Sequence, residues 1–176
     1  MIPLSELNHA TRETFVGHLG GVFEHSPWVA ERAHDRRPFA SREALHASMV
    51  AVVQEAGGEQ QLALLRAHPE LAGREAVQGE MTEHSTHEQG GSGLLNCSPQ
   101  EFARLQELNR AYGEKFGFPF IIAVRGLDRA GIIAAFERRL GNTPEDEMAE
   151  ALRQIARITG FRIAGLVGDA TEAATT

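Results

Sequence analysis

Capping residues, glycines and prolines divide the sequence into helical segments, and residues 98–117 show this pattern most clearly. Ser98 can act as the N-cap of a helix, Pro99 takes its first position, and Glu101 is placed to complete a capping box. Apolar residues then recur on one helical face, at Phe102, Leu105, Leu108 and Tyr112. Gly117 follows, where a helix commonly ends. This stretch predicts a long amphipathic helix.

The same reasoning predicts most of the other elements. We expect helices over 11–19, within 25–39, from Ser41 to the glycines at 57–58, over 60–67, from Asp128 to 140, and from Thr143 onward. Gly20 and Gly21 follow the first of these helices, where we expect a left-handed C-cap. Because almost every periodic segment has a helical period, at least about 60% of the chain should be helical.

One apolar segment does not fit a helix. Residues 118–125 read FPFIIAVR, a run with strand propensity, and no second run of similar quality could pair with it. We therefore expect no sheet, but an all-α, single-domain, multi-helix bundle with one short buried extended segment near 118–125. The backbone N–H and C=O groups of such a segment need hydrogen-bond partners, and a polar ligand is one candidate. The simpler interpretation is that the run is part of the core.

Length, charge and cysteine content narrow the class of protein. The 176 residues suit one domain, which we expect over 1–167, followed by a frayed polar tail at 168–176. The net charge of −7 argues against nonspecific nucleic-acid binding, which relies on Lys and Arg. One cysteine cannot form an internal disulfide, and no apolar run reaches the ~18 residues of a membrane span. The N-terminus lacks a signal-peptide pattern. These features predict a cytoplasmic protein that binds neither nucleic acid nor membranes.

Among the eight histidines, His68 has the sequence context best suited to acid–base chemistry. It follows an apolar helix face and precedes Pro69, so its backbone is restricted and its ring is expected beside the core. The ordinary pKa of a histidine, ~6.5, permits proton donation and acceptance near neutral pH. A surface or capping histidine is the simpler alternative.

The polar cluster at 83–91 is the second candidate for a functional site. It combines hydroxyl, imidazole, carboxylate and amide groups with glycine. Such a segment can form a small-molecule pocket or a solvated loop. His84 and His87 have i, i+3 spacing and could bind a metal, with Glu83 or Glu88 adding oxygen. Their order matches neither HExxH nor HxxEH, and no third ligand is evident downstream. A metal-dependent hydrolase using His84 and His87 is therefore kept as an alternative.

Arg125 and Cys97 are two further candidates. Arg125 ends the apolar 118–125 segment and could bind a carboxylate through two hydrogen bonds, or form a surface ion pair. Cys97 has no Cys/His motif around it, so we expect a packed free thiol rather than a nucleophile.

Three motifs occur in a fixed order: AHPELAG at 67–73, STHEQGGSGL at 85–94 and FGFPFIIAVRG at 116–126. Together they resemble the 2-oxo-4-hydroxy-4-carboxy-5-ureidoimidazoline (OHCU) decarboxylases of urate degradation. The similarity extends over most of the chain, from about RPF at 37–39 to the last long helix. It implies an all-α fold, a homodimer, no cofactor or metal, and formation of (S)-allantoin with loss of CO₂.

The resemblance also assigns roles to residues. It places the catalytic histidine at His68 and a substrate-contacting proline at Pro69. The polar binding segment falls on Ser85, Thr86, His87, Glu88 and Gln89. A segment that contacts the substrate largely through its backbone falls on Phe120, Ile121, Ile122, Ala123 and Val124, followed by Arg125. The resemblance gives His87 no catalytic role.

The chemistry of the implied reaction suits these residues. The substrate carries its carboxylate on a ring carbon conjugated to a C=N bond, and this imine can accept the electron pair left by loss of CO₂. The substrate therefore brings its own electron sink, and no cofactor is required. His68 could deliver the proton, and Glu88 could orient the imidazole or the substrate. The remaining alternative is a non-catalytic helical interaction module, which would need an exposed apolar helix face.

Overall fold

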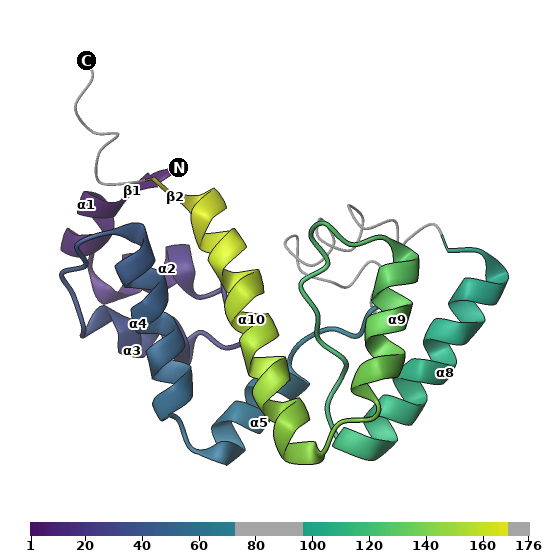
Figure 1. The fold of residues 1–176 in the computed structure, drawn as a ribbon. Helices are drawn as coiled ribbons and strands as arrows, with labels where there is room; N and C mark the ends of the chain where they lie inside the picture. Colours follow the sequence, from purple (N-terminus) through teal and green to yellow (C-terminus); the bar gives the residue numbers. More distant parts are fainter. Residues whose placement is uncertain (73–96, 169–176) are drawn as a thin grey trace. The chain divides into compact units, whose positions relative to one another are not determined.

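A computed structural model describes residues 1–72 and 97–168 (Figure 1). Helices make up 67% of the described residues, so the predicted all-α class and helical content are confirmed there. The elements in chain order are β1 (Ile2–Pro3), α1 (Leu4–His9), α2 (Arg12–Leu19), α3 (Trp28–His34), α4 (Arg42–Glu55), α5 (Gly58–Arg66), α8 (Pro99–Phe116), α9 (Arg129–Arg139), α10 (Pro144–Leu166) and β2 (Val167–Gly168).

The chain divides into two compact units. The first comprises Met1–Leu64 together with the residues from Ala156 onward, and the second comprises Leu65–Ile155. Helix α10 therefore contributes its first half to the second unit and its second half to the first. The predicted single domain over 1–167 stays a prediction. Of the predicted tail, residues 169–176 lie outside the described part of the chain.

The first unit packs α3 against both α2 and α4. Thr11 caps α2 by accepting a hydrogen bond from the Thr14 N–H, and Ser41 caps α4 in the same way through the Ala44 N–H. The Ser41 cap confirms the helix start that was predicted there. The apolar faces of these helices are fully buried at Phe15, Leu19, Val29, Leu45 and Met49.

The predicted left-handed C-cap after α2 is wrong. Gly20 has a φ of −62°, and Gly21 does not have a positive φ either. The Gly20 N–H donates to the Val16 carbonyl oxygen at 2.7 Å. A Cβ placed at Gly20 would lie 2.7 Å from that same oxygen, so glycine allows close packing here rather than a left-handed turn.

The described residues form one small sheet, which the sequence analysis did not expect. Strands β1 and β2 are two residues each and pair in parallel, with Ile2 opposite Val167 and Pro3 opposite Gly168. Both strands belong to the first unit. The sheet therefore does not involve the 118–125 segment, which carries no strand pairing.

His46 on α4 contacts the C-terminal half of α10. Its Nε2 lies 3.1 Å from the Thr159 hydroxyl, and a Cβ placed at Gly160 would meet its ring at 3.3 Å. Burial lowers the pKa of His46 below its ordinary value of 6.5, and a hydrogen bond with the Ala156 backbone partly opposes this effect. The folded protein therefore favours the neutral imidazole.

We expect the free energy of unfolding to decrease as the pH falls through about 6.5. Below that pH the unfolded chain binds a proton at His46 more readily than the folded chain does, so acid favours unfolding. Urea unfolding at about pH 7.5 and about pH 5.5 measures this dependence, and His46→Gln should make it shallower. Identical pH dependence in the two proteins would show that His46 does not contribute.

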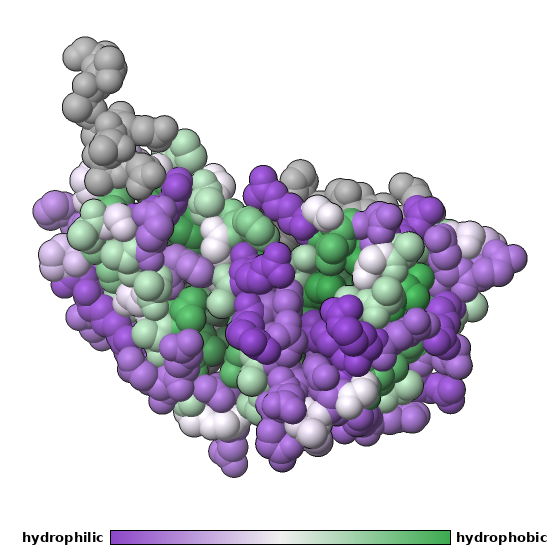
Figure 2. Space-filling model, in the orientation of Figure 1, coloured by the Kyte–Doolittle hydropathy of each residue, from purple (hydrophilic) through white to green (hydrophobic). Residues whose placement is uncertain are grey.

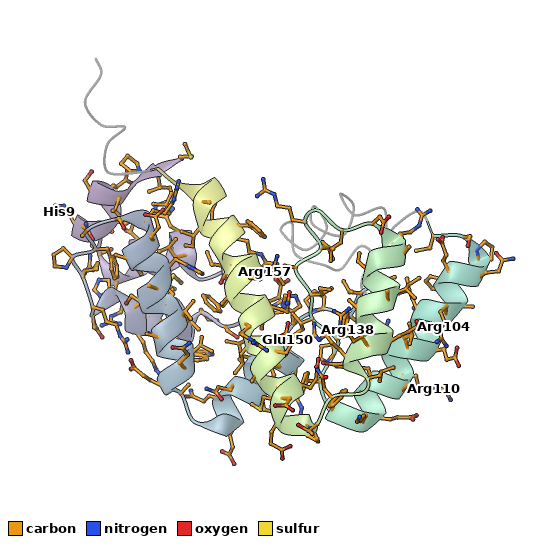
Figure 3. All side chains as sticks on the ribbon, in the orientation of Figure 1. His9, Arg104, Arg110, Arg138, Glu150 and Arg157 are labelled. Atoms are coloured by element: carbon orange, nitrogen blue, oxygen red, sulfur yellow. The ribbon has the colours of Figure 1, made fainter. Side chains whose placement is uncertain are left out.

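The predicted capping box is present at the start of α8, in the second unit. The Ser98 hydroxyl accepts from the Glu101 N–H at 3.1 Å, and the Ser98 N–H donates to the Glu101 carboxylate at 2.9 Å. Helix α8 ends, as predicted, at Gly117, whose φ is +76°. Arg104 on α8, labelled in Figure 3, forms an ion pair at 2.7 Å with Glu137 on α9. Hydrophilic residues predominate on the outer face of α8 (Figure 2).

Ser98→Ala is expected to lower the free energy of unfolding by about 1 kcal/mol, because it removes one half of the capping box. The activity of the folded protein should not change, since the cap lies at the far end of α8 from Gly117. Urea unfolding and an activity assay on the same preparation measure both quantities. Reduced activity at unchanged stability would mean that this helix start belongs to the functional site.

The core of the second unit is largely aromatic. Tyr112 of α8 contacts the rings of four phenylalanines, and Phe120 packs against Phe136 of α9 with ring centroids 3.8 Å apart. The four partners of Tyr112 are Phe116, Phe118, Phe120 and Phe136. Two of these rings, Phe118 and Phe120, come from the extended segment. The apolar run is thus both part of the core and the path between α8 and α9.

Candidate active site

His68 lies in the turn after α5, in the second unit. Its backbone N–H donates to the Leu65 carbonyl oxygen at 3.2 Å. Its side chain is half-buried, and the following Pro69 is buried. The structure therefore gives His68 the position expected from the sequence, at a helix end beside the core.

Side chains of the second unit hold the chain on both sides of His68. Before it, the Arg66 Nε donates to the Gly117 carbonyl oxygen at 2.9 Å. After it, the buried Asn109 of α8 donates to the Leu71 carbonyl oxygen at 2.9 Å. Gln106, also on α8, donates to the carbonyl oxygen of Ala72 at 2.8 Å. These bonds fix the backbone of the turn, which is the rigid support that an acid–base residue requires.

The predicted segment near 118–125 contains neither helix nor strand, and it is buried except at Pro119, which is partly exposed, and Arg125. It lies between two glycines in the left-handed region, Gly117 with φ +76° and Gly126 with φ +83°. All residues from Phe120 to Val124 are buried, whereas Arg125 is exposed in the turn that follows. That turn is closed by a hydrogen bond of 3.0 Å from the Leu127 N–H to the Val124 carbonyl oxygen.

Two side chains provide hydrogen bonds to the middle of this segment. Arg139 of α9 donates from Nη1 to the Ile121 carbonyl oxygen at 2.7 Å. Gln154 of α10 accepts through Oε1 from the Ala123 N–H at 3.0 Å. Among the described residues, none forms a hydrogen bond with the backbone of Ile122, which lies between them. Ile122 as a whole is buried, so its N–H and C=O are left for a partner from outside the described residues.

A buried carboxylate orients Arg139. Glu147 is fully buried and accepts from the Arg139 Nε at 2.8 Å, and the Arg139 Nη2 lies 2.6 Å from the same oxygen. The Tyr112 hydroxyl donates to that oxygen as well, and Asn142 donates to the other at 2.7 Å. Burial, followed by the hydrogen bond to Glu147, raises the pKa of the Tyr112 phenol, so it stays a donor. The guanidinium also stacks on Phe120, 4.5 Å from its centroid.

The predicted polar binding segment lies outside the described residues. This applies to Ser85, Thr86, His87, Glu88 and Gln89, and to His84 of the metal alternative. Within residues 1–72 and 97–168, no group of three His, Cys, Asp or Glu side chains could hold a metal ion. Over the same residues, no helix has the length and apolar character needed to cross a membrane.

Cys97 has the properties expected of a poor nucleophile. Its side chain is partly buried, and burial raises the pKa of the thiol, with the negative charge of Glu101 adding to the effect. Both influences oppose formation of the thiolate, which is the reactive form.

The residues that support the site were not predicted from the sequence. These are Asn109, Arg139, Glu147 and Gln154, and each is a polar residue on a helix face that is otherwise buried. Asn109 shares a face with Leu105, Leu108 and Tyr112. A polar side chain among apolar ones at helical spacing was the available signal, because such a residue needs a partner in the core.

Comparison with known proteins agrees with this arrangement. The sequence profile of the OHCU decarboxylase family matches residues 8–164. The 2-oxo-4-hydroxy-4-carboxy-5-ureidoimidazoline decarboxylase of Haloferax volcanii is 40% identical over 163 residues, covering 93% of this chain and 95% of that protein. Its counterpart in Mus musculus is 38% identical over 154 residues, covering 88% and 86%. The crystal structure of an (S)-allantoin synthase superposes with a TM-score of 0.76 at 29% identity, covering 96% of this chain and 54% of that one.

The matched region includes every element of the second unit, and with it the His68 turn and the extended segment. Two relatives from an archaeon and a mammal match over nearly their whole length. An enzyme is thus favoured over the interaction-module alternative. The chain belongs to the OHCU decarboxylase family, and it is a decarboxylase of the carboxy-lyase class.

Proposed function

We propose that this protein converts OHCU into (S)-allantoin and CO₂, with His68 as the acid–base residue. The observation that carries this proposal is the turn at His68, whose backbone is tied to α8 and Gly117 on both sides and whose imidazole stays half-buried. This histidine stands in the motif through which the chain resembles its family. An imidazole on a fixed backbone beside the core is well suited to transfer a proton to one face of a ring.

The reaction needs little more than orientation and one proton. When the bond between the ring carbon and the carboxylate breaks, its electron pair moves toward the conjugated C=N bond and CO₂ leaves. The resulting enol-like anion then takes a proton on one face of the carbon that bears the ureido group, which makes allantoin chiral. In our proposal the His68 imidazolium provides this proton.

The extended segment supports the same function. Its Ile122 N–H and C=O are a donor and an acceptor side by side in a buried backbone. The substrate ring carries amide N–H and C=O groups that can pair with them, and such a pairing would satisfy both backbone groups. We assign substrate contact to Pro69 and to Phe120–Val124, and we assign binding of a carboxylate to Arg125 in the turn that follows.

The segment at 85–89 completes the proposal from the sequence alone. Glu88 would orient His68 or hold the substrate, and Ser85 and Gln89 would donate hydrogen bonds to ring oxygens as negative charge develops. The homodimer and the cytoplasmic location also stay predictions, and sedimentation of the purified chain would measure the first of them.

The test is to supply the substrate and follow the chirality of the product. Urate and the two preceding enzymes generate OHCU in situ, and circular dichroism then follows the appearance of (S)-allantoin. We expect the rate to rise with the amount of this protein, and to be insensitive to a metal chelator. Loss of activity on chelation would favour the metal-dependent alternative, and no rate enhancement at all would overturn the proposed function.

A further inference from the structure

We propose that Arg139 and Gln154 are positioning residues for this reaction. They hold one edge of the 120–124 segment, so that the opposite edge, at Ile122, meets the substrate ring at a fixed position. This inference rests on the decarboxylase function proposed above.

Hydrogen-bonding directions alternate along an extended chain. Successive residues direct their backbone N–H and C=O groups to opposite sides, as in a strand of a sheet. The Ile121 carbonyl and the Ala123 N–H therefore face one side, where Arg139 and Gln154 bind them at 2.7 and 3.0 Å. The N–H and C=O of Ile122 face the other side. Arg139 and Gln154 thus form with one edge of the segment the hydrogen bonds that a neighbouring strand would form in a sheet.

Each of these two side chains is itself held in one orientation. The Gln154 Nε2 donates at 2.6 Å to the carboxylate of Glu150, which is labelled in Figure 3 and lies one helical turn earlier on α10. Because Nε2 is engaged there, Oε1 is directed to the Ala123 N–H. Arg139 is fixed by Glu147 in the same manner. Arg139 and Gln154 are 4% and 8% exposed, so little water competes for either bond.

The support from Arg139 and Gln154 contributes to the binding of the substrate ring. Backbone groups that bind the ring equally well before and during decarboxylation lower KM more than they raise kcat. If the segment loses an anchor, Ile122 can shift and the ring binds less tightly. Weakened positioning therefore predicts a larger effect on KM than on kcat. A residue that only stabilises the fold would instead reduce the amount of active protein and leave KM unchanged.

Gln154→Met is the central variant, because it keeps the length of the side chain and removes the acceptor for the Ala123 N–H. We expect KM for OHCU to rise by about 10-fold and kcat to stay within about threefold. Gln154→Asn, which is one methylene too short to reach, should act in the same direction. It replaces Gln154→Met as the test if the methionine variant does not fold.

Thr159→Val is the matched control. It removes a buried hydrogen-bonding group from the same helix, the one that pairs with His46 in the first unit. It should lower the temperature of unfolding without changing KM. If Gln154→Met resembles this control, with reduced stability and an unchanged KM, the positioning role is overturned.

Exchanging the side chains at positions 150 and 154 should restore KM. In the double variant Glu150→Gln with Gln154→Glu, the introduced carboxylate can accept from the Ala123 N–H while the introduced amide donates to it. Net charge is preserved, and we expect KM to return to within about threefold of the wild-type value. A folded double variant with KM still raised would contradict the inference. A wild-type protein with no turnover would instead overturn the proposed function, so the two failures are distinguishable.

Discussion

Replacing His68 with asparagine is expected to lower kcat by ~10²–10⁴-fold while leaving KM within about threefold. Asparagine preserves the polarity and approximate size of the side chain, but it cannot donate or accept a proton in the required pH range. The backbone of the turn should not move, because Arg66 and Asn109 hold it from either side. The loss would therefore report proton transfer rather than a change of shape.

Steady-state kinetics with OHCU generated in situ provide the measurement, and His46→Gln provides the control. His46 is a half-buried histidine of the first unit, so its replacement changes a histidine of similar burial in the unit that does not contain the His68 turn. We expect the control to turn over at the wild-type rate near pH 7.5. If His68→Asn also turns over at that rate, the catalytic assignment is wrong and the family resemblance describes only the fold.

The partnership of His68 with Glu88 can be examined in the same assay. Glu88→Gln should cost part of the factor lost in His68→Asn, because in our proposal the Glu88 carboxylate orients or supports the imidazole and the substitution removes its charge. Residues that act as a unit give non-additive effects, so the double variant should be much less impaired than the product of the two single losses. Multiplicative effects would mean that the two residues act independently.

Local signals account for the parts of the fold that could be predicted. The capping box at Ser98, the caps at Ser41 and Asp128, and the left-handed Gly117 each depend on residues within one turn of one another. The extended segment was also predictable, since proline, aromatic and β-branched residues disfavour a helix there. Gly20 was mispredicted because its role is a close contact with the Val16 carbonyl, which the sequence does not distinguish from a turn.

The support of the site depends instead on contacts between distant residues. Arg139 and Ile121 are 18 residues apart, Gln154 and Ala123 are 31 apart, and Asn109 and Leu71 are 38 apart. The burial of Glu147 could not be predicted either. Its position in the first turn of α10 is already accounted for by a favourable interaction with the helix dipole. Its burial against Arg139 follows only from the packing of α9 and the loop after it. The motif residues could therefore be named from the sequence, whereas the groups that hold them could not.

Glu147→Gln is expected to lower the free energy of unfolding by about 3–5 kcal/mol. The substitution preserves shape but leaves the guanidinium of Arg139 buried without a counter-charge, in a side chain that is only 5% exposed. Because a domain is stabilised by only about 5–15 kcal/mol in total, this is a large fraction. Urea unfolding measures it. Tyr112→Phe is the matched control, since it removes one donor to the same carboxylate oxygen and should cost about 1 kcal/mol.

Replacing Arg139 and Glu147 together separates their effect on stability from the effect of Arg139 on substrate positioning. In Arg139→Met with Glu147→Leu, no buried charge is left uncompensated, so much of the stability lost in Glu147→Gln should return. The Ile121 carbonyl, however, would still lack the donor that Arg139 provides at 2.7 Å. We therefore expect a folded protein whose KM for OHCU is raised, as in Gln154→Met. Recovery of stability together with a wild-type KM would show that the buried ion pair serves the fold alone, and that Gln154 holds the segment without it.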